Sequence, residues 1–148
     1  AKPMARRELI QKLTANPPRR RDGTQKPPVA DEPLAREIAD WLEELGYLND
    51  GEYAKTVARH YSARGYGERK LRDELFRRGV PREYWEEALL EAQGPEEGVD
   101  AFLQSRFKGR TPDEKALRRA SDALARRGFR WEEIRAGLNR YGARIEEE

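Results

Sequence analysis

The sequence contains no cysteine. This absence excludes a disulfide framework, thiolate zinc sites and thiol catalysis, and it fits the reducing cytoplasm in which we expect the chain to work. Histidine is nearly absent as well. The single histidine, His60, has no cysteine or carboxylate pair at metal-ligand spacing, so we expect neither a metal site nor acid–base catalysis at this residue.

Long apolar runs are also missing. No segment approaches the roughly 18 apolar residues of a membrane-spanning helix, and no apolar stretch follows the first charges as it would in a signal peptide. Gly65-Tyr66-Gly67 lacks the Gly-Lys-Ser/Thr of a phosphate loop. We therefore expect no membrane contact and no cofactor. A small magnesium-dependent nuclease is the enzymatic alternative, but without converging carboxylates or a Ser/His pair we expect no enzyme.

What the chain does have is charge of both signs. Charged residues make up 39% of the 148 residues, and 30 Lys+Arg against 28 Asp+Glu give a net charge of +2. This total alone does not indicate a nucleic-acid-binding protein, so local clusters of arginine carry more information. The 36% hydrophobic share is low for one compact core, but it suits a row of thin helical modules that each bury one face.

The apolar residues recur with a helical period, and no segment alternates as a strand would. The fold class is therefore predicted to be all-α. Asn49 and Thr111 are predicted N-caps. One apolar stripe is formed by Leu34, Ile38, Trp41, Leu42 and Leu45. The predicted helices cover residues 4–14, 33–45, 50–64, 68–78, 81–93, 96–108, 112–127 and 131–141.

Residues 15–31 break this pattern. Pro17–Pro18 and Pro27–Pro28 cannot lie inside a helix, and the segment has few apolar residues. We predict a long, mobile loop. Its three consecutive arginines, residues 19–21, are interpreted as a solvated linker, with contact to a polyanion as the alternative.

A repeat organises the rest of the chain. A shift of 49 residues places Gly79 on Gly128, Leu75 on Leu124 and the basic pair 77–78 on 126–127. This period predicts a repeating three-helix unit. We expect tandem three-helix repeats that form an elongated, curved array. The first module, residues 1–48, is a degenerate copy that contains the loop at 15–31. The second module is residues 49–93 and the third is residues 94–148.

Two segments carry a family resemblance. Residues 42–80, LEELGYLNDGEYAKTVARHYSARGYGERKLRDELFRRGV, resemble the signature block of the RecX family. Residues 123–138, ALARRGFRWEEIRAGL, resemble the closing motif of that family. The likeness extends over residues 33–142, whereas residues 15–31 do not match the compact first repeat of the family.

The resemblance implies a regulator of the RecA recombinase that has no catalytic centre. RecX proteins bind the RecA–single-stranded DNA filament along its helical groove, and they suppress ATP hydrolysis and strand exchange. The expected partner is therefore that filament, bound by a monomer that has only weak affinity for naked DNA. The alternative is a free-standing DNA-binding helical module that acts through arginine-rich helix faces, which would bind naked DNA strongly and with a steep salt dependence.

The candidate contact residues are cations of the second and third modules, together with one tyrosine. Arginine-rich helix faces bind phosphates or carboxylates through paired hydrogen bonds, and a tyrosine between two glycines can present its ring at a corner. The alternative is a solvated surface that also complements helix dipoles. The candidates are Arg59, Arg64, Tyr66, Arg69, Lys70, Arg72, Arg77, Arg78, Arg126 and Arg127. Reversing the charge of Arg69, Lys70, Arg72 and Arg77 is expected to leave the fold intact.

Overall fold

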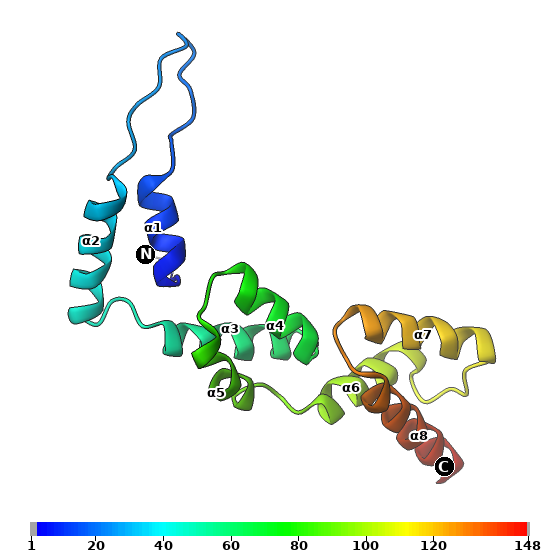
Figure 1. The fold of residues 1–148 in the computed structure, drawn as a ribbon. Helices are drawn as coiled ribbons and strands as arrows, with labels where there is room; N and C mark the ends of the chain where they lie inside the picture. Colours follow the sequence, from blue (N-terminus) through cyan, green and yellow to red (C-terminus); the bar gives the residue numbers. More distant parts are fainter. Residues whose placement is uncertain (1–2, 148) are drawn as a thin grey trace.

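The computed structural model describes residues 3–147, and this range contains helices and loops but no strand (Figure 1). The predicted all-α class is confirmed. No helix in this range is long and apolar enough to cross a membrane. The helices are α1 (Arg6–Thr14), α2 (Glu32–Glu44), α3 (Asp50–Ala63), α4 (Glu68–Arg77), α5 (Trp85–Leu90), which follows the 3₁₀ turn Arg82–Tyr84, α6 (Pro95–Phe107), α7 (Glu114–Arg126) and α8 (Trp131–Glu147).

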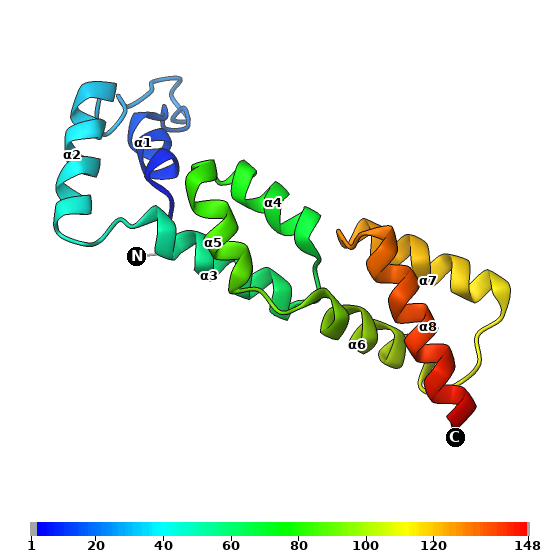
Figure 2. The same cartoon turned by 60° about the horizontal axis from the view of Figure 1, so that its bottom comes forward.

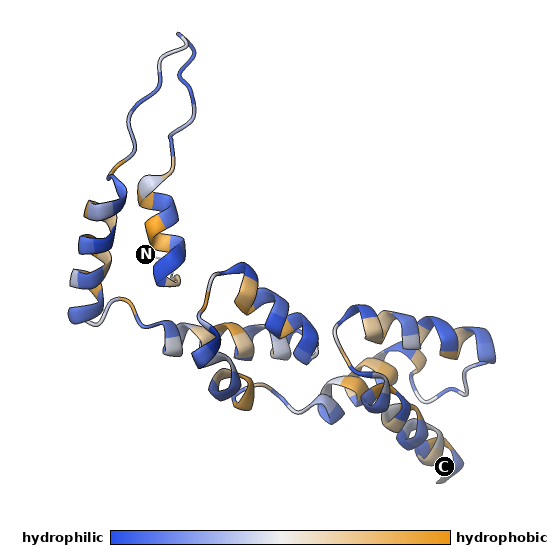
Figure 3. Ribbon diagram, viewed as in Figure 1, coloured by the Kyte–Doolittle hydropathy of each residue, from blue (hydrophilic) through white to orange (hydrophobic). Residues whose placement is uncertain are grey.

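Helices α3 to α8 form two three-helix modules that follow one another in an elongated row (Figures 1 and 2). Helices α3–α5 form the second module predicted from the sequence and α6–α8 form the third, and each module surrounds its own small core. Hydrophobic and hydrophilic residues alternate around these helices in Figure 3, as expected where a helix buries one face. The largest fully buried side chains are Leu71, Leu75, Val99, Leu103, Leu124 and Ile134.

The two modules share the positions that the sequence repeat predicts. Leu75 in α4 and Leu124 in α7 are both 0% exposed. Gly79 and Gly128 follow these helices with φ of +73° and +98°, the left-handed backbone in which glycine ends a helix. The shift of 49 residues therefore relates equivalent places in two structurally similar modules.

Residues 3–48 contain two helices, α1 and α2, where the sequence predicts a degenerate first three-helix module over residues 1–48. Helices α1 and α2 lie side by side in Figures 1 and 2. The connection between them, residues 15–31, has no helix and is largely hydrophilic (Figure 3). Its paired prolines interrupt any helix, and its hydrogen bonds are mostly local, such as Gly23 N–H to the Arg20 carbonyl at 3.0 Å.

The apolar stripe predicted for α2 is only partly buried, because Ile38 and Leu42 are half-buried and its other members are exposed. Ala35 and Ala39 are 0% exposed, whereas Leu34, Trp41 and Leu45 are 45%, 59% and 51% exposed. Helix α2 packs chiefly against α1, and the small alanines allow a close approach of the two helices. A single partner helix covers only a narrow face, so the large side chains beside that face stay in solvent.

Helix boundaries follow the predictions to within two residues except at three places. Helix α5 covers only Trp85–Leu90 of the helix predicted over 81–93, and a 3₁₀ turn precedes it. Asn49 caps α3 as predicted. The N-cap of α7 is Asp113 and not Thr111, because the Asp113 carboxylate accepts the N–H of Ala116 at 2.7 Å. Helix α8 continues past the predicted end near residue 141, since Tyr141 is buried in the module core rather than lying at a frayed end.

Candidate partner-binding surface

Several of the predicted contact residues in the second module are bonded to carboxylates of that module. Arg72 pairs with Glu86 at 2.9 Å and with Glu68 at 3.5 Å. The hydrogen bond to Glu86 is the largest cause of a pKa above the ordinary value at Arg72. Arg59 pairs with Glu91 at 3.4 Å. Both arginines therefore tie the helices of their own module together.

Glu74 binds three further candidates. Its side chain is 3% exposed and lies 2.6 Å from Arg77, 3.2 Å from Arg78 and 3.9 Å from Lys70. Burial alone would raise the pKa of Glu74, but the hydrogen bonds from Arg77 and Arg78 outweigh it and lower the pKa below its ordinary value. The carboxylate stays ionised and neutralises much of the basic cluster on α4.

Arg78 is the most enclosed of these cations. Besides Glu74, its guanidinium donates to the hydroxyl oxygens of Tyr53 at 2.7 Å and Tyr61 at 3.1 Å. Burial lowers the pKa of Arg78, but these bonds outweigh it and the pKa is raised. Arg78 therefore stabilises the module and is not free to bind a partner.

The corner between α3 and α4 packs against the end of α7. The N–H of Gly67 donates to the Arg127 carbonyl at 2.8 Å, and the N–H of Arg69 donates to the Gly128 carbonyl at 3.1 Å. The Arg69 guanidinium also donates to the Ala125 carbonyl at 2.6 Å. The first N–H groups of a helix have no acceptor within that helix, so the carbonyls that end α7 cap the start of α4.

These contacts change the expected role of the predicted cluster. Reversing the charge of Lys70, Arg72 or Arg77 would set carboxylates against Glu74 or Glu86, and reversing Arg69 would remove a bond between the modules. From these contacts we expect such a variant to lose stability, contrary to the prediction from helical spacing. The reason is that helical spacing shows which side chains avoid the core, but not which carboxylates lie opposite them.

Glycine allows this close junction between the modules. A Cβ atom on Gly67 would lie 2.7 Å from the backbone of Gly128, and one on Gly128 would lie 2.5 Å from the Lys70 nitrogen. Tyr66 is half-buried beside them, with its ring 5.9 Å from the ring of Tyr61 and 5.9 Å from the Arg127 guanidinium. Tyr66 is thus part of the junction, not a ring presented to solvent.

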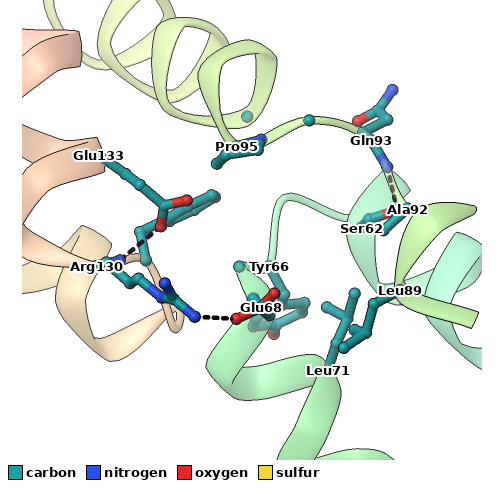
Figure 4. Close-up of a pocket in the computed structure, with 14 residues that line it drawn as sticks. Ser62, Tyr66, Glu68, Leu71, Leu89, Ala92, Gln93, Pro95, Arg130 and Glu133 are labelled. Carbon is teal, nitrogen blue, oxygen red and sulfur yellow. Dashed lines mark hydrogen bonds and ion pairs between the residues drawn. The ribbon is translucent and has the colours of Figure 1, made fainter. Parts of the chain in front are cut away.

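A small pocket adjoins this junction (Figure 4). Its volume is about 160 Å³, and its walls come from both modules. Glu68 and Arg130 form an ion pair across it, and the Arg130 N–H donates to the Glu133 carboxylate at 2.7 Å. The polar groups at its rim bind one another, so we assign this pocket to the junction between the modules.

A larger groove lies on another side of the junction. We call it the α3–α6 groove; it encloses about 820 Å³ between the end of α3, the length of α6 and the side chain of Arg127. Its charged residues are four cations and one carboxylate. They are Arg64, Arg106, Lys108, Arg127 and Glu97.

The groove contains two of the predicted contact residues, Arg64 and Arg127, and two that the sequence reasoning missed, Arg106 and Lys108. Arg106 lies one turn after Phe102, a spacing that places both on one helix face, and this signal could have identified it. Arg126 is exposed on α7 and does not line the groove.

Comparison with known proteins shows consistent similarity. Residues 49–89 match the family model of the second three-helix domain of RecX. The chain is 38% identical over 126 residues to the regulatory protein RecX of Trichlorobacter lovleyi, covering 78% of this chain and 79% of that protein. It is 32% identical over 133 residues to the regulatory protein RecX of Stenotrophomonas maltophilia, covering 88% and 74%. The RecX of Xanthomonas axonopodis pv. citri is 36% identical over 108 residues, covering 71% and 67%.

Proposed function

The chain belongs to the RecX family of regulatory proteins, and we propose that it regulates the RecA recombinase by binding the RecA–single-stranded DNA filament. In this proposal the protein lies along the groove of the filament and inhibits ATP hydrolysis and strand exchange. It acts by binding alone, as a monomer in the cytoplasm and without a cofactor. The observation that carries the proposal is the identity to RecX proteins over most of the chain.

The architecture supports an extended contact. Two modules with separate cores stand in a row, and backbone hydrogen bonds hold them together at the α4–α7 junction. A row of this kind can make many modest contacts along a filament, and their summed affinity requires no deep pocket.

The direct test is the single-stranded-DNA-dependent ATPase activity of RecA, measured with increasing amounts of this protein. We expect suppression that follows the molar ratio of protein to RecA. The suppression should persist when more single-stranded DNA is added, because the bound species is the filament. An absence of suppression at every ratio would contradict the proposal.

The second candidate function, a free-standing DNA-binding module, is favoured by the four cations of the α3–α6 groove. Such a module would suppress the ATPase only by sequestering DNA. Added single-stranded DNA would then restore the full activity, so the same titration separates the two functions.

A further inference from the structure

We propose that the α3–α6 groove binds the sugar–phosphate backbone of a single DNA strand. This inference deepens the proposed function and rests on it, because it names the component of the filament that one surface of the protein contacts. The groove lies between the two modules, so a bound strand would touch both of them.

The charge of the groove is uncompensated. Arg64, Arg106, Lys108 and Arg127 line it with Glu97 as the one carboxylate, and no ion pair joins any of the four cations to a described carboxylate. On α4, by contrast, a single carboxylate, Glu74, pairs with three cations. Cations that converge in a concave surface concentrate the positive potential and attract anions.

Aromatic rings hold two of the guanidinium groups in place. Arg106 and Arg127 lie 5.0 Å and 5.1 Å from the centre of the Phe102 ring, and Arg127 also lies 5.9 Å from the Tyr66 ring. A ring attracts a guanidinium without accepting its N–H groups as a carboxylate does. The N–H donors remain available, and a guanidinium binds phosphate oxygens through two parallel hydrogen bonds.

The shape of the groove favours a nucleic-acid strand over an acidic peptide. Besides its charged residues and Phe102, the walls consist of small or neutral polar side chains: Ala63, Gly65, Gln93, Gly98, Ala101 and Ser105. Arginine clusters also bind acidic peptide motifs, but most modes of peptide recognition use apolar grooves or a strand edge as well, and these walls provide neither. A basic groove that follows a phosphate backbone is how many proteins hold single strands.

The experiment measures the fluorescence anisotropy of a labelled oligothymidylate over a range of salt concentrations. The groove variant carries Arg64→Gln, Arg106→Gln and Lys108→Gln. The matched control carries Lys115→Gln, Arg119→Gln and Arg135→Gln, which removes the same charge from exposed positions of the third module outside the groove. Circular dichroism is used to check that both variants retain their helices.

We expect the groove variant to bind about tenfold more weakly and the control to change by less than about threefold. Each phosphate contact on a single strand contributes about 0.7 to the slope of log K against log salt, so the slope of the groove variant should be flatter by about 2. Equal losses in the two variants would overturn the proposal, because they would indicate general charge attraction.

Two further outcomes would also overturn it. One is no oligothymidylate binding by the wild-type protein at low salt. The other is binding of labelled poly-L-glutamate, but not of the oligonucleotide, with loss in the groove variant; this would assign the groove to an acidic protein segment. The ATPase titration of the wild-type protein needs no affinity for naked DNA, so failure of the proposed function is separately visible.

Discussion

The second and third modules end their middle helices with the same pattern, Leu-x-Arg-Arg-Gly, but the last arginine has a different role in each. Glu74 precedes the pattern in α4, and it binds Arg78 at 3.2 Å. Ala123 stands at the equivalent position in α7. Arg127 therefore has no carboxylate one turn before it, and its guanidinium lies in the α3–α6 groove.

The first helix of each module differs in the same sense. Tyr53 in α3 accepts a hydrogen bond from Arg78 at 2.7 Å, whereas Phe102 in α6 offers Arg127 only the face of a ring. The comparison shows that the apolar positions build both modules, while a few neighbouring positions decide whether cations stabilise the fold or remain available to a partner.

The largest expected effect tests whether the two cores are equivalent. Leu75→Ala and Leu124→Ala each remove a fully buried side chain, and each should lower the free energy of unfolding by about 3 kcal/mol through lost burial and the cavity left behind. Chemical denaturation of the two variants measures this. A near-zero loss in one of them would show that the modules do not share one packing scheme.

The second prediction compares the glycines that end α4 and α7. Gly128→Ala should cost about 3 kcal/mol, because the left-handed backbone costs about 1–2 kcal/mol for a residue with a Cβ and the new methyl group would press on the Lys70 backbone. Gly79→Ala should cost only about 1–2 kcal/mol, since its nearest neighbour is the flexible side chain of Arg7. Equal losses in thermal or chemical unfolding would argue against a tight junction at Gly128.

The third prediction concerns the carboxylate that only the second module has. Glu74→Gln leaves Arg77 and Arg78 without their counter-charge and should cost about 2 kcal/mol at neutral pH. The pKa of Glu74 is lowered in the folded state from an ordinary value of 4.5. Its contribution is therefore complete above that pH and is lost as the pH falls through the lower folded pKa.

Unfolding measured from neutral pH down to pH ~3 should therefore show the difference between wild type and Glu74→Gln shrinking below about pH 4.5. Ala123→Gln in the third module is the matched control, and its difference from wild type should not depend on pH. A constant difference for Glu74→Gln would mean that the ion pairs contribute nothing measurable to stability.

The fourth prediction concerns a variant that gives the third module the carboxylate found at the equivalent position of the second. Ala123→Glu places a carboxylate three and four residues before Arg126 and Arg127, where it can pair with them. Because the site is partly exposed, stability should change by less than about 0.5 kcal/mol. Oligothymidylate affinity should fall by roughly threefold as groove charge is neutralised. The same Ala123→Gln protein is the control, and an equal fall in that protein would refute the charge explanation.

The smallest effect is expected in the loop between α1 and α2, which contrasts with both modules in having almost no core. Residues 15–31 are predicted to be mobile, so trypsin should cut first at Arg19–Arg21, with little effect on the helicity of the rest. Mass spectrometry of the early fragments identifies the site. First cleavage within α3–α8 would show that the loop is better ordered than the modules.

The helical class, the repeat of 49 residues and the positions of the core leucines can all be predicted from the amino-acid sequence. These follow from the spacing of apolar residues, and that spacing acts locally, because residues three or four apart share a helix face. Even the difference between Glu74 and Ala123 can be read from the repeat. Each stands one turn before the two arginines of its module, and only the glutamate can pair with them.

Which cations are free of carboxylate partners, and which face of α2 is buried, depends on how the helices pack in three dimensions. The apolar period cannot show that α2 packs chiefly against one helix, so it does not predict that Trp41 stays exposed. Nor does it bring Gly67 to Gly128, or Arg127 to Phe102. These contacts join residues that are far apart in the chain. Ion pairs, module junctions and grooves depend on such long-range contacts, and the local spacing of residues does not encode them.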